Sequence, residues 1–212
     1  MDKKNTLMSI LIIGALWGMA EATVGYLAHI VSFFTFCGIS GMVMSAIAVY
    51  FMRMAVKTTK KVSSIFYVSL VAASIKLFDL FLPFLPVTKT INPAIAILAE
   101  GLSVVVAWKV FFSHKKAFSS AMFTGIAWRV LYALGVALFN MVFYGSFALP
   151  TSAATHILSF ILLQGVINGI ILYPVFKSEK IFELKGQLAT RPGFAIISLA
   201  MAISLELFSH II

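Results

Sequence analysis

Six ionisable residues lie inside stretches that are otherwise apolar, namely Glu21, Lys76, Asp79, Glu100, Arg129 and Glu206. A charged side chain at the centre of a bilayer costs about 2.5–3.5 kcal/mol on insertion scales, so such residues face one another or a wet cavity and are functional candidates. Four acids against two bases leave at least one carboxylate neutral, hydrogen-bonded or open to a cationic group. We predict a central polar site of Glu21, Glu100 and Arg129, with Lys76, Asp79 and Glu206 nearer its entrance.

Helical spacing indicates how these polar groups are arranged. Lys76 and Asp79 are three residues apart and are expected to pair on one helix. Gln164 and Asn168 are four apart, so they lie on one face and extend the polar seam. An alternative interpretation is structural: the ion pairs would only set helix register, and the two amides would only hydrogen-bond between helices.

Three histidines form a weaker pattern at the outer ends of predicted spans, namely His29, His156 and His210. Glu206 lies four residues before His210, and imidazole with carboxylate suits a transition metal. Two histidines on separate helices would equally suit a haem. Histidines at a membrane interface are also commonly just solvated, so we predict no bound cofactor and keep the metal or haem site as an alternative.

The composition identifies the class of protein that must position these residues. Of 212 residues, 61% are apolar and 11% charged, whereas soluble domains are about 25% charged. This excludes a soluble enzyme, a secreted disulfide scaffold and a disordered chain, and it predicts an all-α, polytopic integral membrane bundle. We expect one transmembrane domain over residues 1–212, with about seven spans near residues 7–30, 41–56, 64–82, 92–112, 118–143, 153–176 and 193–212.

Basic residues predict the orientation. With the N-terminus inside, thirteen of the sixteen lysines and arginines fall in cytoplasmic pieces and only Lys89 falls in an outside loop, as the positive-inside rule requires. We therefore expect a multi-pass protein of a cell (inner) membrane with a cytoplasmic N-terminus. The net charge of +9 is explained by topology and anionic lipid, and no nucleic-acid partner is expected.

A small-residue stripe runs along the first span through Gly14, Gly18 and Ala22. Such stripes let helices approach closely in lipid. This stripe would therefore dock either a neighbouring span or a partner subunit. Hydrolase, metalloprotease and phosphate-binding motifs are missing from the sequence, which favours a protein that is not an enzyme.

The size, the short loops and the small-residue first span before a polar-lined bundle resemble the substrate-capture subunits (S components) of energy-coupling-factor transporters. The resemblance implies docking through Gly14, Gly18 and Ala22 to a coupling subunit with an ATPase. It also implies an outer ligand cavity near Asp79, Glu206 and His210. S components have about six spans, whereas this sequence predicts seven and a C-terminus outside.

We expect the protein to bind and translocate a small polar or cationic solute, as part of a multi-subunit importer or with proton uptake. Two other classes stay open. One is a structural or assembly subunit whose charges only lock helix packing, and the other is an intramembrane metal or haem redox protein.

Overall fold

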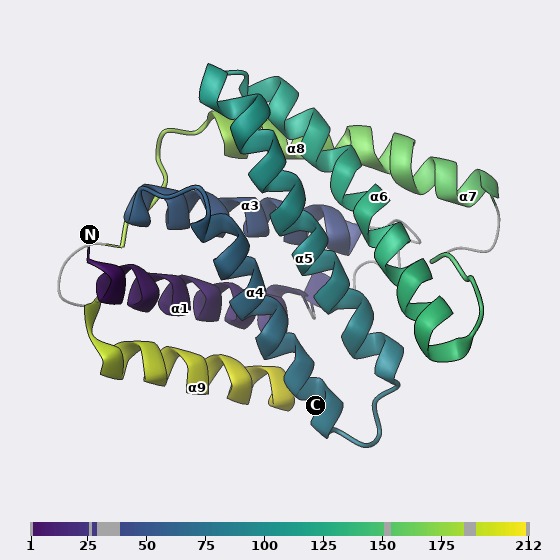
Figure 1. Cartoon of the computed structure of the whole chain (residues 1–212), viewed down its shortest axis with the longest axis horizontal. Coiled ribbons are helices and arrows are strands. Elements are labelled where there is room, and N and C mark those ends of the chain that lie inside the picture. The colour runs from purple at the N-terminus through teal and green to yellow at the C-terminus, as the bar shows by residue number, and fades with distance from the viewer. Residues whose placement is uncertain (1, 26, 29–38, 151–153, 185–189, 211–212) are drawn as a thin grey trace.

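The computed structural model describes residues 2–25, 27–28, 39–150, 154–184 and 190–210, and these residues form helices with no strand among them (Figure 1). Six helices in this part of the chain are long and apolar enough to cross a membrane: Lys3–Gly25, Ser64–Phe81, Val87–His114, Ala117–Tyr144, His156–Lys177 and Pro192–Ser209. The predicted all-helical, membrane-compatible architecture is confirmed. Helix α3 (Ile39–Thr59) covers the predicted second span but is not one of the six, so the count of seven stays a prediction.

The helix ends follow local chemistry. Helix α1 (Lys3–Ala20) begins where the Asp2 side chain accepts a hydrogen bond from the Lys3 backbone N–H at 2.6 Å, as an N-cap does. Helix α6 (Ala117–Tyr144) ends at Gly145, whose φ of +63° is the left-handed conformation that glycine adopts without strain. Helix α9 (Pro192–Ser209) has proline in its first turn, where the missing N–H costs nothing.

Helix α5 (Val87–Val110) corrects one prediction. The corresponding span was predicted to begin at residue 92, but the helix begins five residues earlier, after Pro86, and Pro93 lies inside it. A hydrogen bond of 2.9 Å from the Lys89 backbone N–H to the Pro86 carbonyl closes the first turn. Lys89, predicted to lie in a loop, is therefore helical. Proline inside a helix removes one backbone hydrogen bond and kinks or breaks the helix. The predicted start was wrong because α5 continues through Pro93.

Close helix contacts are made at glycines. Helix α1 packs against α4 (Ser64–Lys76), where a Cβ at Gly14 would lie 2.5 Å from Val71 and one at Gly18 would lie 2.8 Å from Ile75. Helix α6 packs against α8 (Gln164–Lys177), where a Cβ at Gly125 would lie 2.4 Å from the Gly165 carbonyl oxygen. These positions hold glycine because a larger residue would push the helices apart.

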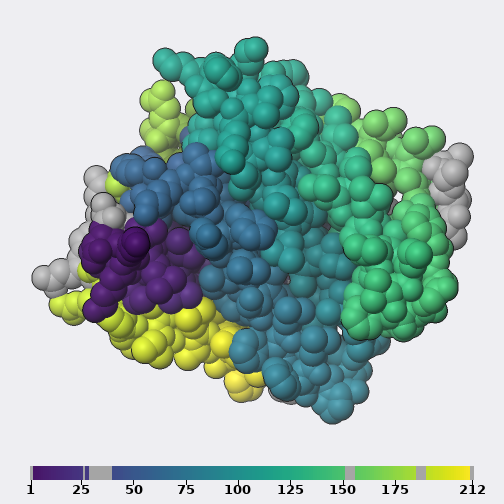
Figure 2. Space-filling model, in the orientation of Figure 1, coloured from purple at the N-terminus to yellow at the C-terminus, as the bar shows by residue number. Residues whose placement is uncertain are grey.

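The helices pack in a continuous order. Helix α9 (yellow) lies against α1 (purple) at one edge of the molecule (Figure 2). Helix α4 contacts both α1 and α5, and α6 contacts both α5 and α8. Helix α3 contacts both α1 and α8. At one end of the bundle Arg53 and Lys57 of α3 donate to the carbonyls of Val175 and Ile181, the latter at 2.7 Å. These cations satisfy carbonyls at and beyond the C-terminus of α8.

Candidate functional site

A cavity of about 690 Å³ lies among the helices, where α1, α4 and α9 end and α3 and α5 begin. Its volume falls within the range of small-molecule sites, roughly 300–1,000 Å³. Five of the eight residues predicted to bind the solute or line the polar seam also line this cavity: Glu21, Lys76, Glu100, Arg129 and Gln164. Ionisable side chains from α4, α5, α6 and the end of α1 therefore converge on one chamber.

Glu100 is one of the buried ionisable residues of the chamber. It lies on α5, is only 5% exposed and faces the cavity. Its carboxylate interacts electrostatically with Glu21, which repels it, and with Arg129, which attracts it. Within the described residues no hydrogen bond or ion pair reaches this carboxylate. Glu100 is thus a buried acid to which the described residues supply no hydrogen-bond or ion-pair partner.

Glu21 begins a π-helical turn, η1 (Glu21–Gly25), that continues α1. Its carboxylate accepts a hydrogen bond of 3.0 Å from the indole N–H of Trp17, which is fully buried. A second π-helical turn, η4 (Ser159–Leu163), connects α7 (Ala154–Leu158) to α8 and contributes Phe160 to the same chamber. Single π-helical turns are frequent at functional sites because they redirect side chains relative to an α-helix.

Arg129 is engaged by the protein on several sides. Its guanidinium donates to the Gly125 carbonyl at 3.0 Å and lies over the rings of Trp128 and Phe160, 4.3 and 5.3 Å from their centroids. With the Asn168 amide assigned from its hydrogen-bond network, the amide oxygen accepts from Arg129 and from the Trp128 indole, each at 2.9 Å. No carboxylate of the described residues forms an ion pair with it.

Asn168 and Gln164 therefore have different roles although they share a helix face. Asn168 is fully buried behind the chamber, where it supports Arg129 and bonds to Ser45 of α3 at 2.8 Å. Gln164 lines the chamber itself. The interhelical hydrogen bonding proposed for both amides is thus observed for Asn168.

The chamber also has an aromatic wall. Trp128, Tyr132 and Phe160 line it, with ring centroids 6.0–6.3 Å apart. Tyr132, Phe160 and Lys89 line the chamber but were not among the predicted site residues. The position of Tyr132, four residues after Trp128 on one helix, was a signal for a shared face, but nothing local indicated that Phe160 would join them.

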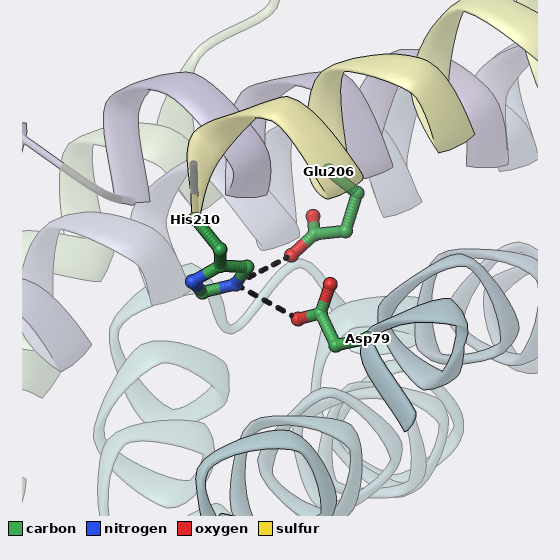
Figure 3. Close-up of side chains that lie close together, drawn as sticks. All are labelled: Asp79, Glu206 and His210. Atoms are coloured by element: carbon green, nitrogen blue, oxygen red, sulfur yellow. Dashed lines mark hydrogen bonds and ion pairs between the residues drawn. The ribbon is translucent and has the colours of Figure 1, made fainter. Parts of the chain in front are cut away.

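A second polar cluster lies beside the chamber. Lys76 forms an ion pair with Asp79, three residues later, at 3.2 Å, as predicted. It forms another ion pair with Glu206 of α9. His210, just after α9, lies 3.0 Å from Asp79, which belongs to the 3₁₀ turn η2 (Leu77–Phe81) (Figure 3). Asp79 and Glu206 do not line the chamber, although Lys76 and His210 do.

Other predicted residues fall elsewhere. Gly14 and Gly18 are buried against α4, so they form no exposed docking surface, and Ala22 is buried and lines the chamber. His156 is exposed on α7, and His29 lies outside the described residues. Of the three histidines, only His210 lies in a group of possible metal ligands that the described residues form.

Comparison of the chain with known protein families, with curated proteins and with solved structures finds no match.

Proposed function

We propose that the protein is a membrane transport protein that binds a small polar or cationic solute in the chamber. The observation that carries this proposal is the pair of carboxylates, Glu21 and Glu100, that face one cavity and form no ion pair within the described residues. Burying a carboxylate without a partner is costly, so an incoming ammonium or N–H donor would gain an interaction that the protein lacks.

The rest of the chamber fits a solute with an apolar body. The rings of Trp128, Tyr132 and Phe160 offer aromatic faces, and ligand sites are commonly apolar with a few convergent polar groups. Arg129 is already engaged by Asn168, Gly125 and two rings. We therefore assign the binding of the solute's charged group to the carboxylates.

The proposal places the chamber toward the outside of a cell (inner) membrane, with the N-terminus in the cytoplasm. The elements that meet at the chamber are the ends of α1, α4 and α9 and the beginnings of α3 and α5. The opposite ends carry most of the basic residues, among them Lys57, Lys109 and Lys177 in the last turns of their helices. The positive-inside rule would put those ends in the cytoplasm.

Translocation would require alternating exposure of this chamber, driven by a coupling subunit with an ATPase or by proton uptake on a carboxylate. Because Gly14 and Gly18 face α4, a coupling subunit would dock elsewhere than on that stripe. The competing proposal is a structural subunit, for which the chamber residues would bind nothing.

Three probes of similar size and different charge test the proposal: 2-phenylethylamine, 2-phenylethanol and 3-phenylpropionate. Thermal unfolding of the purified protein in detergent is measured with each probe. We expect stabilisation by the amine, reduced by about tenfold in apparent affinity in Glu100→Gln, which corresponds to losing about 1.4 kcal/mol. Glu179→Gln, an exposed acid outside the chamber, is the matched control and should respond like the parent.

The other outcomes contradict parts of the proposal. Preferential stabilisation by the anion would assign the charge of the site to Arg129 and Lys89 instead of the carboxylates. No stabilisation by any probe, with Glu100→Gln changing only the folded yield, would favour the structural subunit.

A further inference from the structure

We propose that Asp79, Glu206 and His210 form a binding site for a divalent transition-metal ion such as Zn²⁺. This inference rests on the cluster beside the chamber and is independent of the solute proposal. The three side chains come from two elements far apart in sequence, η2 and the end of α9 (Figure 3).

The three side chains lie nearly as close together as the ligands of one metal ion. The Nε2 atom of His210 lies 3.0 Å from Asp79 Oδ2 and 3.7 Å from Glu206 Oε1, and one ligand atom from each residue lies within 4.8 Å of the others. Ligands at about 2.0–2.2 Å from a zinc ion are separated from one another by roughly 3–3.6 Å. Small side-chain adjustments would therefore bring all three into a common coordination sphere.

The carboxylates have unused capacity for a cation. Asp79 is 1% exposed and Glu206 is fully buried. Within the described part of the chain, the second oxygen of each, Asp79 Oδ1 and Glu206 Oε2, is buried without a hydrogen-bond partner. A network built only for packing would be expected to satisfy these atoms, because an unpaired buried polar atom costs about 1–3 kcal/mol.

Charge balance gives the same result. If both carboxyl groups are ionised and the imidazole is neutral, the single ammonium of Lys76 leaves one negative charge uncompensated. A divalent ion in place of the ammonium would bring the cluster to neutrality, with neutral imidazole as the third ligand. An imidazole with two carboxylates is a donor set that suits zinc and its neighbours better than magnesium.

Lys76 would act as a tethered competitor for the ion. Its ammonium contacts the same two oxygens that would bind the metal, Asp79 Oδ2 and Glu206 Oε1. Lys76 and His210 both also line the chamber, so the ammonium has space to move into and the ion has a path to the cluster. Three protein ligands would leave a coordination position open toward that chamber.

The test measures binding of Zn²⁺ alone to the untagged, chelator-treated full chain in detergent by isothermal titration calorimetry, with Mg²⁺ as the comparison ion. We expect a single high-affinity zinc site that is weakened by at least about 10–100-fold in His210→Ala, the scale seen when groups supporting a metal are removed. His156→Ala is the matched control, because His156 is exposed and outside the cluster. It should bind zinc like the parent.

A second variant tests the competition with Lys76. Lys76→Met should bind Zn²⁺ more tightly than the parent, and Zn²⁺ should raise its unfolding temperature more than that of the parent. Equal zinc affinity in the parent and His210→Ala would overturn the proposal, and so would the absence of zinc binding. If Lys76→Met does not fold even with zinc, His210→Ala decides, since it alters only a partly exposed residue at the end of α9.

Discussion

Two groups of buried charge lie next to each other in this protein and differ in how they are neutralised. In the cluster, Lys76 is paired with both Asp79 and Glu206. In the chamber, Glu100 faces a cavity with no ion-pair partner among the described residues, and Arg129 is held by an amide, a carbonyl and aromatic rings. The difference shows that burial of a charge alone does not determine whether the fold supplies an ion-pair partner for it.

What distinguishes them is the partner that the fold provides. A buried ion pair is strongly destabilised when one member is removed, because the other is left uncompensated. A buried acid that has no ion-pair partner has the opposite property, since neutralising it relieves a cost. Removing one charge from each group should therefore change the free energy of unfolding in opposite directions, and this is the most direct test of the comparison.

The largest expected effect belongs to Lys76→Met in metal-free conditions. Removing the ammonium leaves Asp79 and Glu206 adjacent and uncompensated, so we expect the free energy of unfolding to fall by about 3–5 kcal/mol. Thermal unfolding in detergent with a chelator measures this change. Lys89→Met, an exposed lysine at the chamber, is the matched control. If Lys76→Met and Lys89→Met both lowered the free energy of unfolding only slightly, the ion pairs of Lys76 would not stabilise the cluster, and the cluster would not differ from the chamber in this respect.

A smaller effect of opposite sign is expected for Glu100→Gln. The amide keeps the shape of the side chain but removes the unpaired charge and its repulsion with Glu21, at the cost of the attraction to Arg129. Because an unsatisfied buried group costs about 1–3 kcal/mol, we expect the free energy of unfolding without ligand to rise by up to that amount. Destabilisation, measured in the same unfolding experiment, would mean that Glu100 pairs structurally with Arg129.

The smallest effect is expected for Glu21→Gln. The amide oxygen still accepts the hydrogen bond from Trp17, and Glu21 is only partly buried. We expect a change of less than about 1 kcal/mol in the free energy of unfolding. Tryptophan fluorescence of the folded protein should also stay close to that of the parent. A large loss would indicate that the charge itself holds the π-helical turn.

Much of the fold follows from local sequence. Apolar runs of the length of a bilayer predict helices, because lipid cannot satisfy exposed backbone groups. Charges within those runs predict inward-facing residues for the same reason. On these grounds the sequence predicts the membrane-compatible helices and the pairing of Lys76 with Asp79. It also predicts that Glu21, Glu100 and Arg129 share one polar site, and all three line the chamber.

Only the tertiary structure decided which distant residues meet. Glu206 reaches Lys76 across 130 positions, and Ser45 reaches Asn168 across 123. Gly14 and Gly18 pack against α4. Helix α5 begins at Val87, five residues before Asn92. Helical periodicity states which face a residue occupies but not which helix lies opposite, since that depends on how all the helices pack at once. The sequence therefore determined that charges are buried, and the packing decided which of them are paired and which face a cavity.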